Sequence, residues 1–258
     1  KKKMDKISVQ KIISLKNANK ITMITAYDYV SGHIVNNSNA EMILVGDSLG
    51  TTTLGFDFTN SVKIEDIVRA TESISRVGIN KLLVSDMPYK TYETKNSALE
   101  NASLLINSGA DAVKLEGGRE KSEIINYLVK NNIQVMGHIG IKPQSVNNIS
   151  DYKIIGKNKE EQDNLLEDAK SIESSGVFSI VLELVDSKLS KRITKNLSIP
   201  TIGISSGKST DGQVQVYNDL IGYSPKKLPK HAKVFDNLFE KAQKSINAFV
   251  EESKRNFK

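Results

Sequence analysis

The stretch Val113-Lys114-Leu115-Glu116-Gly117-Gly118 shows the pattern that decides the fold: a short apolar run that ends on ionisable side chains and a pair of glycines. Short apolar runs rich in Val and Ile are typical of buried parallel strands. Four more runs of this kind end on Asp47, Asp86, His138 and Glu183. Barrels and open α/β sheets place their catalytic groups at the carboxyl ends of such strands. The pattern therefore predicts an enzyme.

The chain alternates between two kinds of segment. Segments whose apolar residues are three and four apart, as in amphipathic helices, separate the apolar runs, and several of them end on Gly or Asn, for example at Gly109 and Asn132. Eight strands in a β-α repeat predict a closed (β/α)8 barrel, the TIM-barrel fold. The alternative, a doubly wound open sheet, would carry a Gly-x-Gly-x-x-Gly turn after an early strand, and this sequence has none. The predicted strands are 21–25, 42–45, 81–85, 112–115, 134–137, 179–182, 201–204 and 213–217.

The length fits one domain. Barrels of this type take about 250 residues around one core, so we expect a single barrel domain over residues 1–258. A short opening helix with Val9, Ile12, Ile13 and Leu15 is expected to close the amino end of the barrel. A second helix near the other end either completes the barrel wall or meets a partner subunit, and the sequence leaves both open. Its apolar face comprises Val234, Leu238, Ala242, Ile246, Phe249 and Val250.

Composition excludes several classes of function. The chain has no cysteine, which rules out disulfides, thiolate nucleophiles and sulfur-ligated metals, so any metal must bind oxygen or nitrogen. We find neither a membrane span nor a signal peptide, and we expect a cytoplasmic protein. The 36 Lys and Arg are interspersed with 30 acidic residues. The net charge of +6 therefore fits a solvated surface better than a nucleic-acid partner, and small-molecule substrates are expected.

Two loops do not fit a plain repeat. Residues 140–159, which include Pro143, Asn147, Ser150 and Gly156, form a connection whose length is typical of an active-site lid. The stretch Gly203-Ile204-Ser205-Ser206-Gly207 follows the seventh strand, where barrels often hold phosphate. Turn formation explains this stretch nearly as well, because no lysine-serine pair completes a phosphate loop.

Three acids at predicted strand ends suggest a metal site. Asp47, Asp86 and Glu116 follow successive strands, and carboxylates are the ligands that hard cations such as Mg²⁺ prefer. Three mutually repelling carboxylates at one barrel mouth need a cation or a proton to offset their repulsion. Taken singly, each acid could instead cap a helix or shape a turn.

Three further residues suggest catalysis. Lys114 lies two residues from Glu116, so both share one face of a strand, and Lys114 either holds an anion or forms a structural ion pair. His138 has small neighbours that leave room for a ligand, although a lone histidine is often structural. Glu183 is flanked by aliphatic residues, which raise proton affinity toward that of a general base; the alternative is a pair with a lysine.

Six motifs, taken in order and spacing, resemble one known family. They are Thr25-Ala26-Tyr27-Asp28, Val45-Gly46-Asp47-Ser48-Leu49-Gly50, Asp86-Met87-Pro88, Val113-Lys114-Leu115-Glu116-Gly117-Gly118, Gly137-His138-Ile139-Gly140 with Pro143-Gln144-Ser145, and Thr210-Asp211-Gly212-Gln213. From about residue 21 to 222 the chain is similar to the ketopantoate hydroxymethyltransferase (3-methyl-2-oxobutanoate hydroxymethyltransferase) family.

The resemblance implies a barrel of the phosphoenolpyruvate/pyruvate-type superfamily with one Mg²⁺ per subunit, in a homo-oligomer that is often a decamer. It implies that a hydroxymethyl group passes from 5,10-methylenetetrahydrofolate to 3-methyl-2-oxobutanoate, giving 2-dehydropantoate for pantothenate biosynthesis. An alternative keeps the barrel and Mg²⁺ but makes the enzyme a carbon–carbon lyase or mutase of another small 2-oxo acid. A basic nucleic-acid-binding or scaffold protein is the non-enzymatic alternative.

The resemblance also implies roles for single residues. Asp47 and Asp86 would ligate the metal, with Glu116 as the third metal-site acid, and Glu183 would accept the substrate proton. Two departures concern the loops around the mouth: Ser205-Ser206 stands where the family commonly has Gly-Ala, and Ser150-Asp151 where it has Gly-Gly. The residues that would bind the oxo acid are Asp47, Ser48, Asp86, Lys114 and His138.

Overall fold

The computed structural model describes residues 6–146, 148, 151–226 and 232–256. Asn147 and Ser150 of the expected lid lie outside these residues. The chain divides into two compact units, Lys1–Val214 and Gln215–Lys258, and the single domain over residues 1–258 stays a prediction. In the described part of the chain, no helix has the length and apolar character that a membrane crossing requires.

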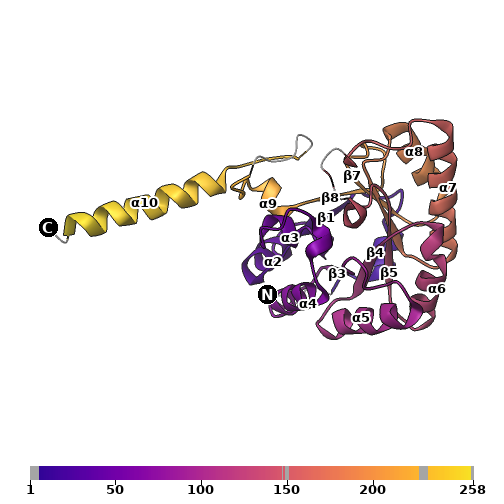
Figure 1. The fold of residues 1–258 in the computed structure, drawn as a ribbon, viewed down its shortest axis with the longest axis horizontal. Coiled ribbons are helices and arrows are strands. Elements are labelled where there is room, and N and C mark those ends of the chain that lie inside the picture. Colours follow the sequence, from indigo (N-terminus) through magenta and orange to yellow (C-terminus); the bar gives the residue numbers. More distant parts are fainter. Residues whose placement is uncertain (1–5, 147, 149–150, 227–231, 257–258) are drawn as a thin grey trace. The chain divides into compact units, whose positions relative to one another are not determined.

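Eight strands close into a barrel in sequence order (Figure 1), and each neighbouring pair with a described register is parallel. This confirms the predicted (β/α)8 fold and excludes the open, doubly wound sheet. The strands are β1 (Ile21–Thr25), β2 (Met42–Val45), β3 (Leu82–Asp86), β4 (Ala112–Glu116), β5 (Val135–Gly140), β6 (Ser179–Glu183), β7 (Thr201–Ile204) and β8 (Gly212–Gln215).

Several strands end later than predicted, and one ends earlier. β3, β4 and β6 each continue one residue further and include Asp86, Glu116 and Glu183, while β5 continues through His138. These side chains are therefore held by the barrel ladder itself and not by the loops that follow. β8 is shorter than predicted, because helix α9 begins at Tyr217.

Helices cover the outside of the barrel, and Figure 1 shows α4 to α8 following one another around the strands. Gly78, Gly109, Asn132 and Gly176 all have positive φ, which confirms them as the residues that stop their helices. The connections contain α2 (Tyr29–Asn36), α3 (Leu49–Thr52), η1 (Thr59–Ser61), α4 (Ile64–Ser75), α5 (Lys95–Asn107), η2 (Arg119–Lys121), α6 (Ser122–Lys130), η3 (Pro143–Ser145), α7 (Lys159–Ser174) and α8 (Ser187–Asn196).

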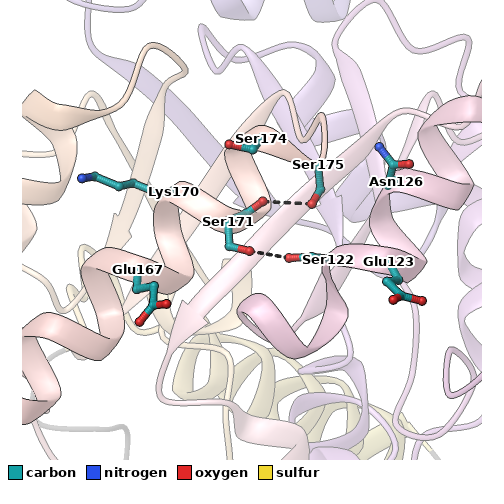
Figure 2. Close-up of a pocket in the computed structure, with 8 residues that line it drawn as sticks. All are labelled: Ser122, Glu123, Asn126, Glu167, Lys170, Ser171, Ser174 and Ser175. Carbon is teal, nitrogen blue, oxygen red and sulfur yellow. Dashed lines mark hydrogen bonds between the residues drawn. The ribbon is translucent and has the colours of Figure 1, made fainter.

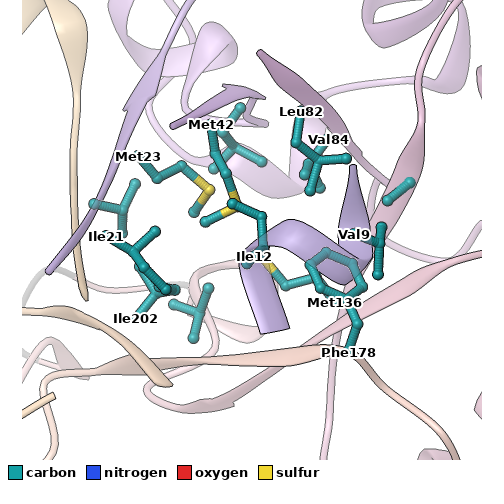
Figure 3. Packing of buried hydrophobic residues seen from close by; sticks show 14 of the residues in the cluster. Val9, Ile12, Ile21, Met23, Met42, Leu82, Val84, Met136, Phe178 and Ile202 are labelled. Carbon is teal, nitrogen blue, oxygen red and sulfur yellow. The ribbon is translucent and has the colours of Figure 1, made fainter. Parts of the chain in front are cut away.

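Helix α1 (Val9–Ser14) closes the amino end of the barrel, as predicted. The Ser8 side chain caps it by accepting a hydrogen bond from the backbone N–H of Lys11. Ile12 is 0% exposed and packs in one apolar cluster with the first residues of several strands, among them Met42 and Leu82 (Figure 3). The amino end is thus a dry, apolar plug, and the polar groups gather at the carboxyl end.

The second unit contains α9 (Tyr217–Leu220) and α10 (Leu238–Asn256). Two backbone hydrogen bonds connect this region: Phe235 N–H donates to the Leu220 carbonyl (2.8 Å), and Leu238 N–H donates to the Ile221 carbonyl (3.0 Å). The predicted terminal helix is confirmed from Leu238 onward, whereas Val234 precedes it. Its two alternative roles, barrel wall or partner contact, stay predictions.

The plug yields a stability prediction. Ile12→Ala should lower the free energy of unfolding by about 2–5 kcal/mol, because it removes buried methylene groups and leaves a cavity. The matched control is Ile13→Ala, since Ile13 is 38% exposed; it should change stability by about 0.5 kcal/mol or less. Urea denaturation followed by circular dichroism measures both changes. Equal losses of unfolding free energy in the two variants would contradict the conclusion that Ile12 packs inside the amino end of the barrel.

Candidate active site

The carboxyl ends of β3 to β6 bring most of the predicted residues together. In the ladder, Asp86 pairs in register with Lys114, and Glu116 with His138. All four side chains are buried, with residue exposures of 2 to 4%. Glu183 ends β6 in register with Gly140, which follows His138 by two residues on β5. The site predicted from strand ends is therefore one buried cluster.

Lys114 is at the centre of this cluster. Its Nζ lies 2.9 Å from Oδ1 of Asp86 and 3.3 Å from Nδ1 of His138. Oε1 of Glu116 lies 3.7 Å from the same His138 nitrogen, which confirms that Lys114 and Glu116 share one face of β4. The ion pair considered as an alternative for Lys114 is thus present, and its role in holding an anion stays a prediction.

His138 is held as a neutral imidazole. Its Nε2 lies 2.9 Å from the carbonyl oxygen of Ile141, and because a carbonyl only accepts, Nε2 carries the proton. Nδ1 is then free to accept from Lys114. Burial and the nearby Lys114 charge lower the pKa of His138 well below its usual value. Its 3.5 Å contact with Oε2 of Glu183 is consequently not an ion pair.

Gln144, a residue of the predicted lid, forms hydrogen bonds with two of the acids, and no pattern in the sequence predicts this role. Its side-chain N–H donates to Oδ2 of Asp47 (2.9 Å) and to the Met87 carbonyl (2.9 Å), and its backbone N–H donates to Oε2 of Glu116 (3.2 Å). Asp47, two residues beyond β2, donates its own backbone N–H to Oδ2 of Asp86 at 3.0 Å. One residue of the predicted lid thus bonds directly to two of the carboxylates.

Two tyrosines support the same region. The Tyr92 hydroxyl donates to Oε1 of Gln144 (2.6 Å) and accepts from the backbone N–H of Glu116 (3.3 Å). The Tyr27 hydroxyl lies 2.8 Å from Oγ of Ser48. Tyr27 stands inside a family motif, whereas no sequence signal singled out Tyr92.

Burial dominates the electrostatics of the acids. It raises the pKa of Asp47 to about 7, with repulsion from Asp86 as the next cause. Burial likewise raises the pKa of Asp86, although Lys114 opposes the rise, and raises that of Glu116 well above its usual value. For Lys114, burial disfavours the charge, but attraction to Asp86, Glu116 and Asp47 outweighs it and raises the pKa. Lys114 alone does not neutralise the three acids.

The donor set suits a hard cation. Oδ1 of Asp86 and Oε1 of Glu116 are buried and accept no hydrogen bond, although the former has Lys114 as its ion-pair partner. Carboxylate oxygens of this kind fit Mg²⁺. Within the described residues, however, no three His, Asp or Glu side chains stand where they could hold a metal together. The metal set Asp47, Asp86 and Glu116 stays a prediction.

Glu183 has a different environment from the other acids. Its side chain is 17% exposed, and burial among its surroundings raises its pKa to about 8. Lys114 lowers this pKa and Asp47 raises it, both by smaller amounts. Among the ion pairs of the described residues, none joins Glu183 to a lysine, so the alternative of a structural lysine pair is not observed. The raised proton affinity is the property a general base needs near neutral pH.

A separate hollow of about 560 Å³ lies between α6 and α7 (Figure 2). Hydroxyl groups dominate it and bond to one another, as Ser122 does to Ser171 at 2.7 Å. No predicted site residue lines it, so its size does not make it the catalytic centre. Its lining comprises Ser122, Glu123, Asn126, Glu167, Lys170, Ser171, Ser174 and Ser175.

Buried acids, a lysine and a neutral histidine at the carboxyl ends of its strands define this chain as a (β/α)8-barrel enzyme. The family model described as ketopantoate hydroxymethyltransferase matches residues 6–257. The chain belongs to this family.

Curated relatives agree over nearly the whole chain. A protein from Thermosipho africanus named 3-methyl-2-oxobutanoate hydroxymethyltransferase is 43% identical over 249 residues, covering 96% of this chain and 94% of the relative. One of the same name from Pseudothermotoga lettingae is 45% identical over 246 residues, covering 95% and 93%. The chain is therefore an enzyme of the hydroxymethyltransferase type.

Solved structures with low identity share the fold. A putative phosphonomutase from Burkholderia cenocepacia J2315 has a TM-score of 0.63 at 13% identity, covering 93% of this chain and 96% of that one. A 2,3-dimethylmalate lyase, described as a PEP mutase/isocitrate lyase superfamily member, has a TM-score of 0.57 at 10% identity, covering 97% and 88%. A phosphonopyruvate hydrolase complexed with oxalate and Mg²⁺ has a TM-score of 0.61 at 11% identity, covering 96% and 87%. These likenesses confirm the barrel fold.

The pKa of Glu183 gives a pH prediction for the metal-free protein. The folded-state pKa of about 8 lies above the usual 4.5, so the native state binds this proton more tightly than the unfolded chain does. Glu183 should therefore not affect stability below the lower value, and stability should be lost as pH rises from the lower value to the higher one, above which the loss stays constant. Relative to Glu183→Gln, wild type should become progressively less stable across this window.

The measurement is urea denaturation of both proteins in EDTA at about pH 5, 7 and 9, which bracket the titration. Other groups titrate in both proteins, so their contributions largely cancel in the difference. A difference in unfolding free energy that is the same at all three pH values would show that Glu183 titrates normally.

Proposed function

We propose that this enzyme transfers a hydroxymethyl group from 5,10-methylenetetrahydrofolate to 3-methyl-2-oxobutanoate, giving 2-dehydropantoate in pantothenate biosynthesis. Family membership and the names of the relatives support the reaction type. The proposal is carried by two residues at the mouth of the barrel. Lys114 is a candidate partner for an anion, and Glu183 is an acid whose pKa is raised to about 8. For this reaction, the oxo acid needs a cation that binds its carboxylate and a base that removes the proton from its carbon 3.

Glu183 serves as the proton acceptor at carbon 3 of the oxo acid. A base with a pKa near the working pH combines a useful ionised fraction with enough proton affinity to act. The resulting enolate forms a bond from carbon 3 to the methylene carbon of the folate. The two carbon–nitrogen bonds of that unit break, and water supplies the hydroxyl group. The released nitrogens take up one proton from that water and the proton held by Glu183, and tetrahydrofolate leaves.

Other residues bind and orient the oxo acid. Lys114 holds its carboxylate, while Ser48 and His138 orient oxygens near the new hydroxymethyl group. The 2.8 Å contact between Tyr27 and Ser48 fixes the serine hydroxyl, and the Ile141 carbonyl fixes the imidazole. A neutral His138, whose one N–H is donated to the Ile141 carbonyl, adds no second positive charge beside Lys114.

Asp47, Asp86 and Glu116 would hold one Mg²⁺ per subunit, replacing the protons that burial favours on these acids. When bound, this ion supplies Lewis acidity that stabilises negative charge on the keto oxygen. The phosphonopyruvate hydrolase of the same fold was solved with Mg²⁺ and oxalate, a small dianion. Cytoplasmic location and a decameric homo-oligomer are further parts of this proposal, supported by the family resemblance.

The reaction can be tested at its first step. Wild type should exchange the carbon 3 hydrogen of 3-methyl-2-oxobutanoate in D₂O when Mg²⁺ is present, and Glu183→Gln should lose about 100-fold or more of this rate, because a general base is removed. Proton NMR follows the loss of the carbon 3 signal. Addition of 5,10-methylenetetrahydrofolate should then yield 2-dehydropantoate.

The matched control is Glu123→Gln, the same change at a side chain that is 85% exposed, and it should retain the wild-type rate. Unchanged exchange in Glu183→Gln would show that another group takes the proton. Exchange without any folate-dependent product would favour the alternative, a lyase or mutase of another 2-oxo acid.

Metal binding can be tested without activity. Mg²⁺ at 100 times its dissociation constant should stabilise wild type by about 2.7 kcal/mol, since it binds only the folded state. Glu116→Gln should remove this gain and should not lower the melting temperature of the metal-free protein, because burial already favours the neutral form of Glu116 and glutamine is neutral. Differential scanning fluorimetry with and without EDTA measures both, with Glu123→Gln as control. A full Mg²⁺ gain in Glu116→Gln would exclude Glu116 from the metal site.

A further inference from the structure

The backbone directly after Glu183 adopts a conformation that most residues avoid. Leu184 has φ of +51°, in the left-handed region where a side chain with a Cβ is disfavoured. Such strain persists only where the surrounding structure imposes it, and it concentrates at functional sites. The turn therefore needs partners that hold it.

Ser206 holds this turn from both sides. Its hydroxyl donates to the carbonyl of Leu182 at 2.7 Å and accepts from the N–H of Val185 at 3.0 Å, so one oxygen joins the residues that flank Glu183 and Leu184. The Ile204 carbonyl, at 3.1 Å, is an alternative acceptor for the same proton. Ser206 is 1% exposed, so bulk water cannot replace the hydrogen bonds of its hydroxyl.

The remaining support comes from the main chain. The Leu184 N–H donates to the Ile204 carbonyl at 3.0 Å, and the Glu183 carbonyl accepts from Ile141 N–H at 2.9 Å. The second bond depends on Gly140, where a Cβ would lie 2.2 Å from the Glu183 carbonyl oxygen. These backbone bonds do not depend on the side chains of the donors and acceptors, whereas the bonds of Ser206 do.

We propose that Ser206 is a positioning residue for Glu183: its hydroxyl fixes the left-handed turn and thereby aims the carboxylate into the barrel mouth. This inference rests on the proposed role of Glu183 as proton acceptor. Ser206 acts through the backbone and touches no reacting atom. The role belongs to this chain and not to the whole family, which commonly has Gly-Ala where Ser205-Ser206 stands. Lys114 and Ser48 lie on other strands or loops, so loss of the Ser206 hydroxyl should affect proton transfer and not the binding of the oxo acid.

The test is Mg²⁺-dependent hydrogen exchange at carbon 3 of 3-methyl-2-oxobutanoate, measured over a range of substrate concentrations. Ser206→Ala should lower kcat about tenfold at unchanged KM, because small displacements of a catalytic group can cost up to about 100-fold. Ser206→Thr keeps a hydroxyl and should restore most of kcat. Ser205→Ala removes the same atom from the neighbouring side chain and should match wild type.

Melting temperatures are measured for every variant, and the assay is run well below the lowest of them. A kcat within twofold of wild type in Ser206→Ala would overturn the inference, as would an equal loss in Ser205→Ala, which would indicate a general loop effect. If Ser206→Ala does not fold, Ser206→Thr decides: wild-type kcat supports the inference, and a tenfold loss overturns it. Absence of exchange in wild type would instead refute the proposed function.

Discussion

The burial of several carboxylates around a single lysine is the constraint on which this site depends. Removing Asp47, Asp86 and Glu116 from water disfavours their charged forms, and their mutual repulsion adds to that cost. Lys114 and the N–H groups of Gln144 offset only part of it, since two buried carboxylate oxygens accept no hydrogen bond. Such an arrangement is unfavourable in isolation. It persists because the barrel ladder fixes the backbone that bears it.

The barrel separates this polar cluster from the part that stabilises the fold. At the amino end, α1 inserts Ile12 among apolar residues such as Met23 and Phe178, with no polar partner to satisfy. At the carboxyl end, the last residues of β3, β4 and β6 bear acids. The same strands thus supply apolar packing at one end and costly polar chemistry at the other. This division lets the active site depart from the residue types that would be most stable there.

Sequence reasoning succeeded where a short-range rule applies. Alternation along a strand placed Lys114 and Glu116 on one face, and the spacing of Val9 and Ile12 predicted a plug helix. It failed for residues whose roles depend on distant partners. Gln144 meets Asp47 across 97 positions of the chain, and Tyr92 meets Gln144 across 52. No local pattern encodes such contacts, because they arise only when the barrel closes.

Glu183 differs from Asp86 in the side chain that lies beside it. Asp86 lies against the charged Lys114, whereas Glu183 lies against an imidazole kept neutral by burial and by that same lysine. Lys114 therefore acts in two ways: it favours the ionised form of its direct neighbour, and it adds to the burial that disfavours a second cation beside Glu183. With no ion-pair partner at His138, Glu183 retains the raised pKa that suits proton transfer. Two carboxylates in one mouth thereby have different neighbours, a charged lysine beside Asp86 and a neutral imidazole beside Glu183.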